Sequence, residues 1–145
     1  MKPSILLRVA AVLSLLYFLG HTAGRPWTPV HSPAVDAVVD AMKQQRFAAM
    51  GRSRTYWDFY QGFGLAISLD LLVQTLVLWH LGTMAKADPA RVRPLVALFC
   101  VALVANGVLG TIFFFPSPVV LAVAIAVCLA LSLFVSRPRR TAVSG

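Results

Sequence analysis

The apolar stretch from Tyr56 to Leu81 carries the side chains whose types could do chemistry inside a membrane. Its polar members are Asp58, Gln61, Asp70, Gln74 and His80. An ionisable side chain in the middle of a spanning helix costs roughly 2.5–3.5 kcal/mol on insertion scales, so Asp70 is expected to face protein or water. Asn106 is predicted at a similar depth in the third apolar run. Asp70, Asn106 and Gln74 therefore form either a polar clasp between helices or the floor of a site for a ligand or a proton.

A second polar group is predicted at the outer ends of the first two spans. His21 ends the first span, and Asp58 and Gln61 lie on one face at the start of the second. A histidine beside an aspartate can serve as a general base, so His21 and Asp58 are the candidate catalytic pair. The alternative is that both lie at a wet interface where a charge costs little. The full set of predicted ligand-binding residues is Asp70, Asn106, Gln74, Gln61, Asp58, His21, Trp27 and Tyr60.

No metal or cofactor site is predicted. His21, His31 and Asp58 lack the spacing of metal ligands, and the chain has no nucleophile elbow, phosphate loop, H-E-x-x-H or haem-attachment motif. Cys100 and Cys128 lie in apolar runs without a C-x-x-C pattern, which favours packing over redox chemistry. Whether the protein is an enzyme is left open by these observations.

The composition is that of a membrane protein. Of 145 residues, 59% are hydrophobic and only 12% are charged, which is too apolar for an ordinary soluble domain. The net charge of +8 comes from basic residues between the apolar runs, where anionic headgroups and the positive-inside rule account for them. Nucleic acid is therefore not a predicted partner, whereas membrane lipids are.

The predicted fold is all-α, a bundle of four transmembrane helices in a single domain over residues 1–136. The spans are expected at about residues 4–21, 57–81, 94–115 and 118–135, with a basic tail at 137–145. The first could alternatively be a cleaved signal peptide. Small residues every few positions predict close packing, with Gly107 and Gly110 in the third span and an alanine stripe in the fourth. The stripe consists of Ala122, Ala126 and Ala130.

The long first loop is predicted to contain a short amphipathic helix over about residues 33–50. Ser32 and Pro33 resemble an N-cap followed by proline at the first helical position. Apolar residues then recur at helical spacing, and Gly51 is a candidate stop. The helix is too short and too polar to span, so we expect it on the membrane surface or over the end of the bundle. The excess of Lys and Arg in the N-terminal end, second loop and tail places both termini in the cytoplasm.

The segments GHTAG at 20–24 and RSRTYWDFYQGFG at 52–64, within a four-span layout, resemble small uncharacterised bacterial integral membrane proteins. In layout the chain is similar to the DoxX-like group. This resemblance implies a four-helix bundle in the bacterial inner membrane and transfers no catalytic residue.

Three functions remain as hypotheses. The first is a binding protein that holds a small apolar or lipid-like molecule in a polar-lined intramembrane pocket. The second is a membrane-embedded, isomerase-like enzyme that moves a proton on a lipid or sterol-like substrate, with His21 and Asp58 as acid and base. The third is a structural subunit, or a homo-oligomer, that associates through the fourth span.

Overall fold

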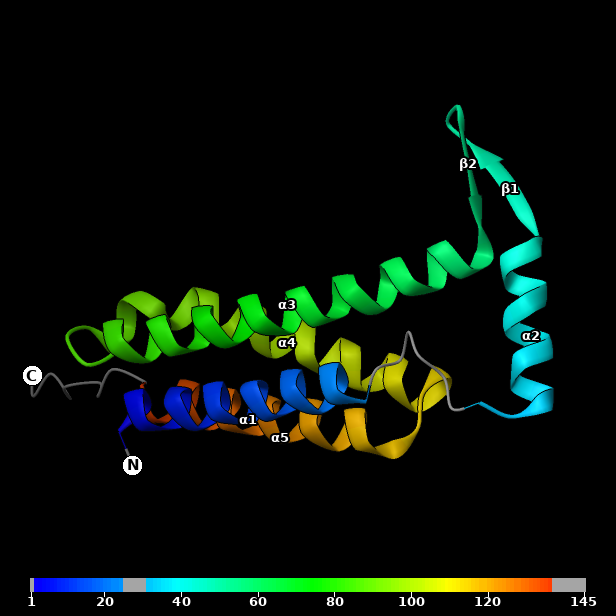
Figure 1. Cartoon of the computed structure of the whole chain (residues 1–145). Helices are drawn as coiled ribbons and strands as arrows, with labels where there is room; N and C mark the ends of the chain where they lie inside the picture. Colours follow the sequence, from blue (N-terminus) through cyan, green and yellow to red (C-terminus); the bar gives the residue numbers. More distant parts are fainter. Residues whose placement is uncertain (1, 25–30, 137–145) are drawn as a thin grey trace, which may run out of the picture. The chain divides into compact units, whose positions relative to one another are not determined.

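The computed structural model describes residues 2–24 and 31–136, and this part of the chain is mostly helical (Figure 1). The elements in order are α1 (Pro3–Ala23), α2 (Pro33–Gln44), β1 (Arg46–Ala49), β2 (Arg52–Thr55), α3 (Tyr56–Met84), α4 (Pro89–Phe113) and α5 (Pro116–Val135). Trp27 and the predicted tail at 137–145 lie outside the described residues.

Four helices, α1, α3, α4 and α5, are long and apolar enough to cross a membrane, as is typical of a multi-pass membrane protein. Each of the four predicted spans falls on one of them. The third predicted span starts late, because α4 begins at Pro89 rather than near residue 94. Asp88 is its N-cap: the Oδ1 atom accepts hydrogen bonds from the backbone N–H groups of Ala90 (3.0 Å) and Arg91 (3.2 Å).

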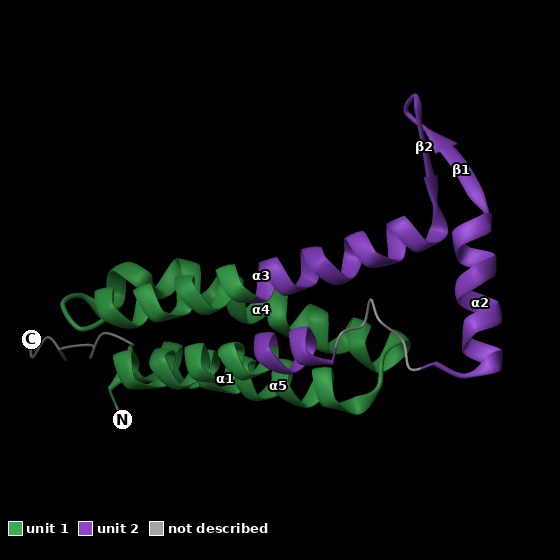
Figure 2. Cartoon of the chain, in the orientation of Figure 1, with its two compact units in different colours: residues 1–17, 72–145 green, residues 18–71 purple. Residues whose placement is uncertain are grey.

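The chain divides into two compact units, which we describe separately (Figure 2). Unit 1 comprises residues 1–17 and 72–145, and unit 2 comprises residues 18–71. The single domain predicted over residues 1–136 is thus described as two compact units.

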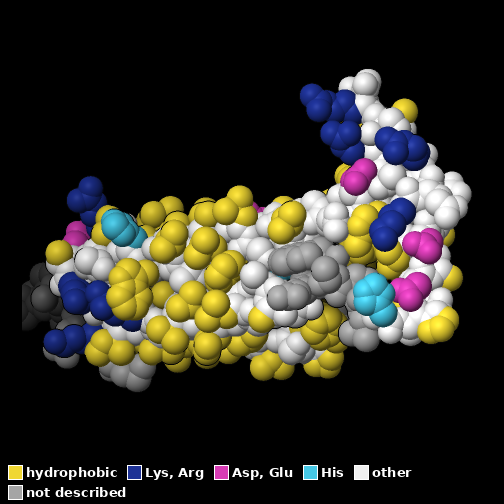
Figure 3. All heavy atoms as spheres, in the orientation of Figure 1, with side chains coloured by type: hydrophobic (Ala, Val, Ile, Leu, Met, Phe, Trp, Pro, Cys, Tyr) yellow, Lys and Arg dark blue, Asp and Glu magenta, His cyan; other side chains and the backbone are white. Residues whose placement is uncertain are grey.

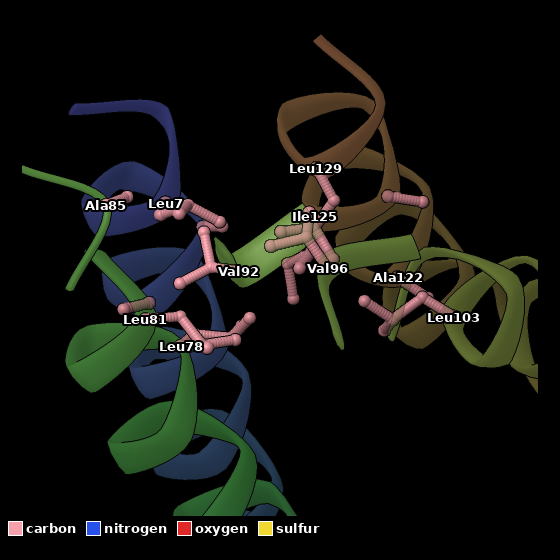
Figure 4. Packing of buried hydrophobic residues seen from close by; sticks show 13 residues of the cluster. Leu7, Leu78, Leu81, Ala85, Val92, Val96, Leu103, Ala122, Ile125 and Leu129 are labelled. Atoms are coloured by element: carbon pink, nitrogen blue, oxygen red, sulfur yellow. The ribbon is translucent and has the colours of Figure 1, made fainter. Parts of the chain in front are cut away.

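Unit 1 contains the hydrophobic core, to which α1, α3, α4 and α5 all contribute side chains (Figure 4). Its largest fully buried members are Leu7, Leu78, Val96, Ile125 and Leu129. The predicted small-residue packing is confirmed for α4 and α5. Gly107 and Gly110 are buried on α4, and Ala122 and Ala126 of the stripe are buried on α5.

Of the two buried glycines of α4, Gly110 has the tighter contact with α5. A Cβ atom added there would lie 2.8 Å from Val119 Cγ2, whereas one added at Gly107 would lie 3.7 Å from Val123 Cγ2. At the other end of the hairpin, the Arg93 guanidinium donates a hydrogen bond of 2.6 Å to the Leu133 carbonyl in the last turn of α5. A cation at a helix C-terminus is stabilising, because the last carbonyls carry partial negative charge.

Unit 2 corrects the prediction for the first loop. A helix does begin at Pro33, where the Ser32 hydroxyl accepts a hydrogen bond from the Val35 N–H (3.3 Å), but it ends at Gln44 rather than near residue 50. The residues that follow form an antiparallel hairpin in which Arg46 pairs with Thr55 and Ala49 with Arg52.

The hairpin turn consists of Met50 and Gly51, and both have positive φ (50° and 75°). Two-residue turns with positive φ match the twist of the flanking strands, so this turn favours a hairpin over a continued helix. Gly51, predicted as a helix stop, therefore belongs to a β-turn.

Candidate functional site

Asp58, a predicted catalytic residue, caps the first turn of α3. Its Oδ2 atom accepts a hydrogen bond from the Thr55 N–H at 2.9 Å, and the Thr55 hydroxyl accepts one from the Asp58 N–H at 3.0 Å. This reciprocal pair is a capping box, which satisfies two backbone donors at a helix start. The T-x-x-D spacing at 55–58 was the sequence signal for this role.

The structure does not place His21 beside Asp58. His21 Nδ1 lies 3.1 Å from the Ser68 hydroxyl, and the Thr22 hydroxyl lies 3.1 Å from the same oxygen. Asp58 lies about 15 Å from Ser68 along α3, given a rise of about 1.5 Å per residue. The three-residue cluster of His21, Thr22 and Ser68 thus replaces the predicted acid–base pair as the polar contact at the end of α1.

Gln74, predicted to line an intramembrane site, instead joins α3 to α1 within unit 1. Its amide nitrogen donates a hydrogen bond to the Ser14 hydroxyl at 2.9 Å, and the Thr75 hydroxyl donates to the same oxygen at 3.0 Å. Ser14 is fully buried. Ser14 and Thr75 are partners that hydropathy alone did not identify, because a lone serine or threonine in an apolar run gives no sign of what it faces.

Asp70 and Asn106 are both exposed on their helices. The Asn106 amide donates a hydrogen bond of 3.1 Å to the Ala102 carbonyl one turn earlier in α4. Because Asp70 belongs to unit 2 and Asn106 to unit 1, their predicted pairing stays a prediction. Gln61 is half-buried on α3.

An apolar groove of about 440 Å³ lies between α2 and the start of α3 in unit 2. The Trp57 and Tyr60 rings stack along one wall, with centroids 5.4 Å apart, and the Lys43 ammonium lies 5.7 Å from the centroid of the Trp57 ring. The residues that line this groove, which we call the α2–α3 groove, are Ala34, Val35, Val38, Val39, Met42, Trp57 and Tyr60.

A second groove of unit 2, of about 300 Å³, follows α3 away from the hairpin, and we call it the Arg54 groove. Its lining residues are Arg54, Asp58, Phe59, Gly62, Phe63 and Ala66. The rings of Phe59 and Phe63 meet edge to face at 4.7 Å, and Phe47 of β1 contacts the Phe59 ring at 5.7 Å. Of these residues, sequence analysis singled out only Asp58 as a candidate.

Unit 1 has an apolar groove of about 400 Å³ between α4 and α5. Thr111 and Cys100 are the polar or polarisable members of its lining, and the rest are Val, Ala and Gly. The Cys100 thiol contacts the Ala126 carbonyl at 3.6 Å, which is consistent with the packing role predicted for it.

Charge is distributed unevenly over the face drawn in Figure 3, where Lys and Arg side chains gather on the hairpin and at the left-hand end of the long helices, and hydrophobic side chains cover the middle of these helices. Within the described ranges, no group of three or more His, Cys, Asp or Glu side chains could hold a metal ion. In comparisons with known proteins, no family model, no curated protein and no solved structure matches the chain.

Proposed function

We propose that this protein is an integral membrane protein that binds a small apolar or lipid-like molecule, and that the α2–α3 groove is the binding site. The groove carries the proposal because it combines apolar walls with an aromatic stack at the point where a spanning helix begins. Small-molecule sites are concave and mostly apolar, with a few polar groups that fix orientation. This placement differs from the polar-lined intramembrane pocket around Asp70 and Asn106 that the sequence predicted.

The chemistry of the groove suits an elongated apolar ligand with a polar end. Val35, Val39 and Met42 supply aliphatic contacts from α2, and the Tyr60 hydroxyl supplies a donor and acceptor at the α3 wall. Each buried CH₂ group of a ligand contributes about 0.8 kcal/mol, so about ten buried CH₂ groups correspond to micromolar binding before ordering costs are subtracted.

The membrane setting is part of the proposal. α2 acts as an amphipathic helix on the outer surface of a bacterial inner membrane, with both termini in the cytoplasm, and the layout is DoxX-like. Support comes from the four long apolar helices, from Trp57 and Tyr60, whose residue types favour membrane interfaces, and from the distribution of Lys and Arg.

The isomerase-like and subunit alternatives receive less support. Asp58 is bonded to Thr55 in the helix cap, and His21 Nδ1 lies beside the Ser68 hydroxyl, so the structure does not form the His21–Asp58 pair that the enzyme hypothesis uses. Ala122 and Ala126, the stripe expected to meet a partner, are buried against other helices of unit 1.

Native mass spectrometry of the protein released from mild detergent tests the proposal. A ligand in the α2–α3 groove appears as a stoichiometric adduct in the wild type, and Val39→Gln, which places an amide in the groove wall, lowers its occupancy. Ala41→Gln is the matched control, because Ala41 is an exposed residue of the same helix outside the groove lining. An adduct equally abundant in both variants, or an empty wild type after dosing with a long-chain alcohol, overturns the proposal.

A further inference from the structure

We infer that the Arg54 groove binds one anionic membrane lipid, with the lipid phosphate at Arg54 and an acyl chain along the adjoining face of α3. This site is separate from the α2–α3 groove. It depends on α3 entering a membrane, and it does not depend on which ligand, if any, occupies the other groove.

The acyl-chain part of the site is a continuous apolar surface on α3. Phe59, Gly62, Phe63 and Ala66 recur at the i, i+3, i+4, i+7 spacing of one helix face, which extends about 10 Å along the axis. Gly62 leaves a gap in this face, because a Cβ added there would have no heavy atom within 4 Å. Phe59 and Phe63 are both more than half exposed, so this face of α3 is available to an acyl chain that lies over Gly62.

The headgroup part of the site is cationic. Residues 46–55 include Arg46, Arg52 and Arg54 but no Asp or Glu. The strand register puts Arg52 and Arg54 on the same face of the hairpin, about 7 Å apart along the strand. A guanidinium offers several N–H donors in a planar fork that matches a phosphate, and two neighbouring ones attract a phosphodiester together.

The hydrogen bonds that these arginines already make leave further donors for a ligand. Arg54 donates from Nη1 to the Ser53 carbonyl at 3.1 Å, and Arg46 donates from Nε to the Ser53 hydroxyl at 3.1 Å. Each guanidinium carries five N–H donors. Asp58 is the acidic member of the groove lining, but its Oδ2 atom is bonded to the Thr55 N–H, and Arg52 and Arg54 on one face of the hairpin outnumber its single charge.

A membrane lipid fits this arrangement better than a soluble anion. The cationic residues come first and the apolar face follows, as the phosphate and the acyl chain of a lipid do. Tyr56 and Trp57 start α3 and are residue types of the membrane interface, so Arg54 just before them lies at headgroup level. Phe63 and Ala66 then lie deeper, at the level of the acyl chains. A free phosphate would use the arginines and leave the Phe59–Ala66 face empty.

The test is lipid retention by the full chain ejected from nanodiscs that contain phosphatidylglycerol and phosphatidylcholine in equal amounts, read by native mass spectrometry. The wild type is expected to retain one phosphatidylglycerol in preference to phosphatidylcholine. Arg54→Gln lowers that preference about fivefold, the equivalent of about 1 kcal/mol for one basic residue near an anionic surface. Arg91→Gln, at an exposed arginine of α4, leaves the preference unchanged.

A second matched pair of variants tests the part of the site that binds the acyl chain. Gly62→Leu fills the gap in the α3 face and lowers retention of phosphatidylglycerol, whereas Gly20→Leu does not, although Gly20 is also a helical glycine with open space at its Cβ. Circular dichroism of each variant establishes that the fold is intact. Equal retention of the two lipids by the wild type, equal effects of the two glycine variants, or displacement of the lipid by millimolar inorganic phosphate overturns the inference.

Discussion

Gly110 and Gly107 provide a paired test of how closely α4 and α5 pack. Both lie buried on α4, but a Cβ at Gly110 would be 2.8 Å from Val119 Cγ2 and one at Gly107 would be 3.7 Å from Val123 Cγ2, an ordinary contact. Val119 cannot easily move aside, because a β-branched side chain on a helix has one strongly preferred χ1 rotamer. Gly110→Ala should therefore destabilise the protein, and Gly107→Ala should not.

The expected difference in the free energy of unfolding comes from two contributions. Helix propensity acts on both substitutions, and overpacking acts on only one of them. Replacing glycine by alanine within a helix gains about 1 kcal/mol in propensity in either position. Overpacking costs about 1–3 kcal/mol and applies only at Gly110, so the two free energies of unfolding should differ by that amount. Gly107→Ala should be neutral or stabilising by up to about 1 kcal/mol.

Equilibrium unfolding of the full chain in mixed micelles, titrated with SDS and followed by circular dichroism, measures this difference. Val119→Ala in the Gly110→Ala background should recover most of the loss, because it removes the Cγ2 atom against which the new methyl group would press. Equal effects of the two glycine substitutions, or no recovery in the double variant, would refute the packing argument.

Three further predictions concern polar contacts and the hairpin turn. Ser14→Ala removes the hydroxyl that accepts hydrogen bonds from both Gln74 and Thr75, so it should lower the free energy of unfolding by about 1–3 kcal/mol in the same titration. Thr111→Ala is the control and should change little, because the Thr111 hydroxyl donates to a carbonyl of its own helix. Asp58→Ala should speed amide hydrogen exchange in the first turn of α3, and Asp58→Asn should speed it less, because the oxygen of an amide side chain also accepts a hydrogen bond. Identical exchange rates in the two variants would contradict the capping role. Gly51→Ala should cost the hairpin about 1–2 kcal/mol, visible as faster proteolysis at the turn, and an unchanged cleavage rate would count against the positive φ.

Sequence alone was enough to locate the long helices, because an apolar run of spanning length is a strong local signal. The start of α2 was also predicted, because its cap at Ser32 is local in sequence, whereas the start of α4 after the Asp88 cap was placed too late, near residue 94. The segment from Phe47 to Met50 was harder, because a short apolar run fits a helix or a strand equally well. Whether this segment forms a helix or a strand depends on the positive φ at Met50, and a methionine in the sequence does not predict positive φ.

The candidate site was less predictable than the fold. The partners of Ser14 and Ser68 lie on other helices, and which faces of two helices meet depends on rotations that hydropathy does not encode. Asp58 could have been assigned to the cap from its spacing to Thr55, but its neighbourhood of aromatic and basic residues favoured an interfacial interpretation. Arg54 lies in the 52–64 segment that sequence analysis quoted, but only the hairpin places it at the end of an apolar groove.

Strand β2 runs into α3 without an intervening residue, and this junction has a mechanical consequence. Thr55 is the last residue of the strand and caps the helix, the Tyr56 N–H donates to the Gln45 carbonyl at 3.3 Å, and Phe47 contacts the Tyr56 ring at 5.1 Å. The hairpin is therefore bonded to and packed against the first turn of α3, and it is not a free loop. A spin label at the fully exposed Met50 would turn with that end of the helix and magnify small rotations about its axis into displacements large enough to measure.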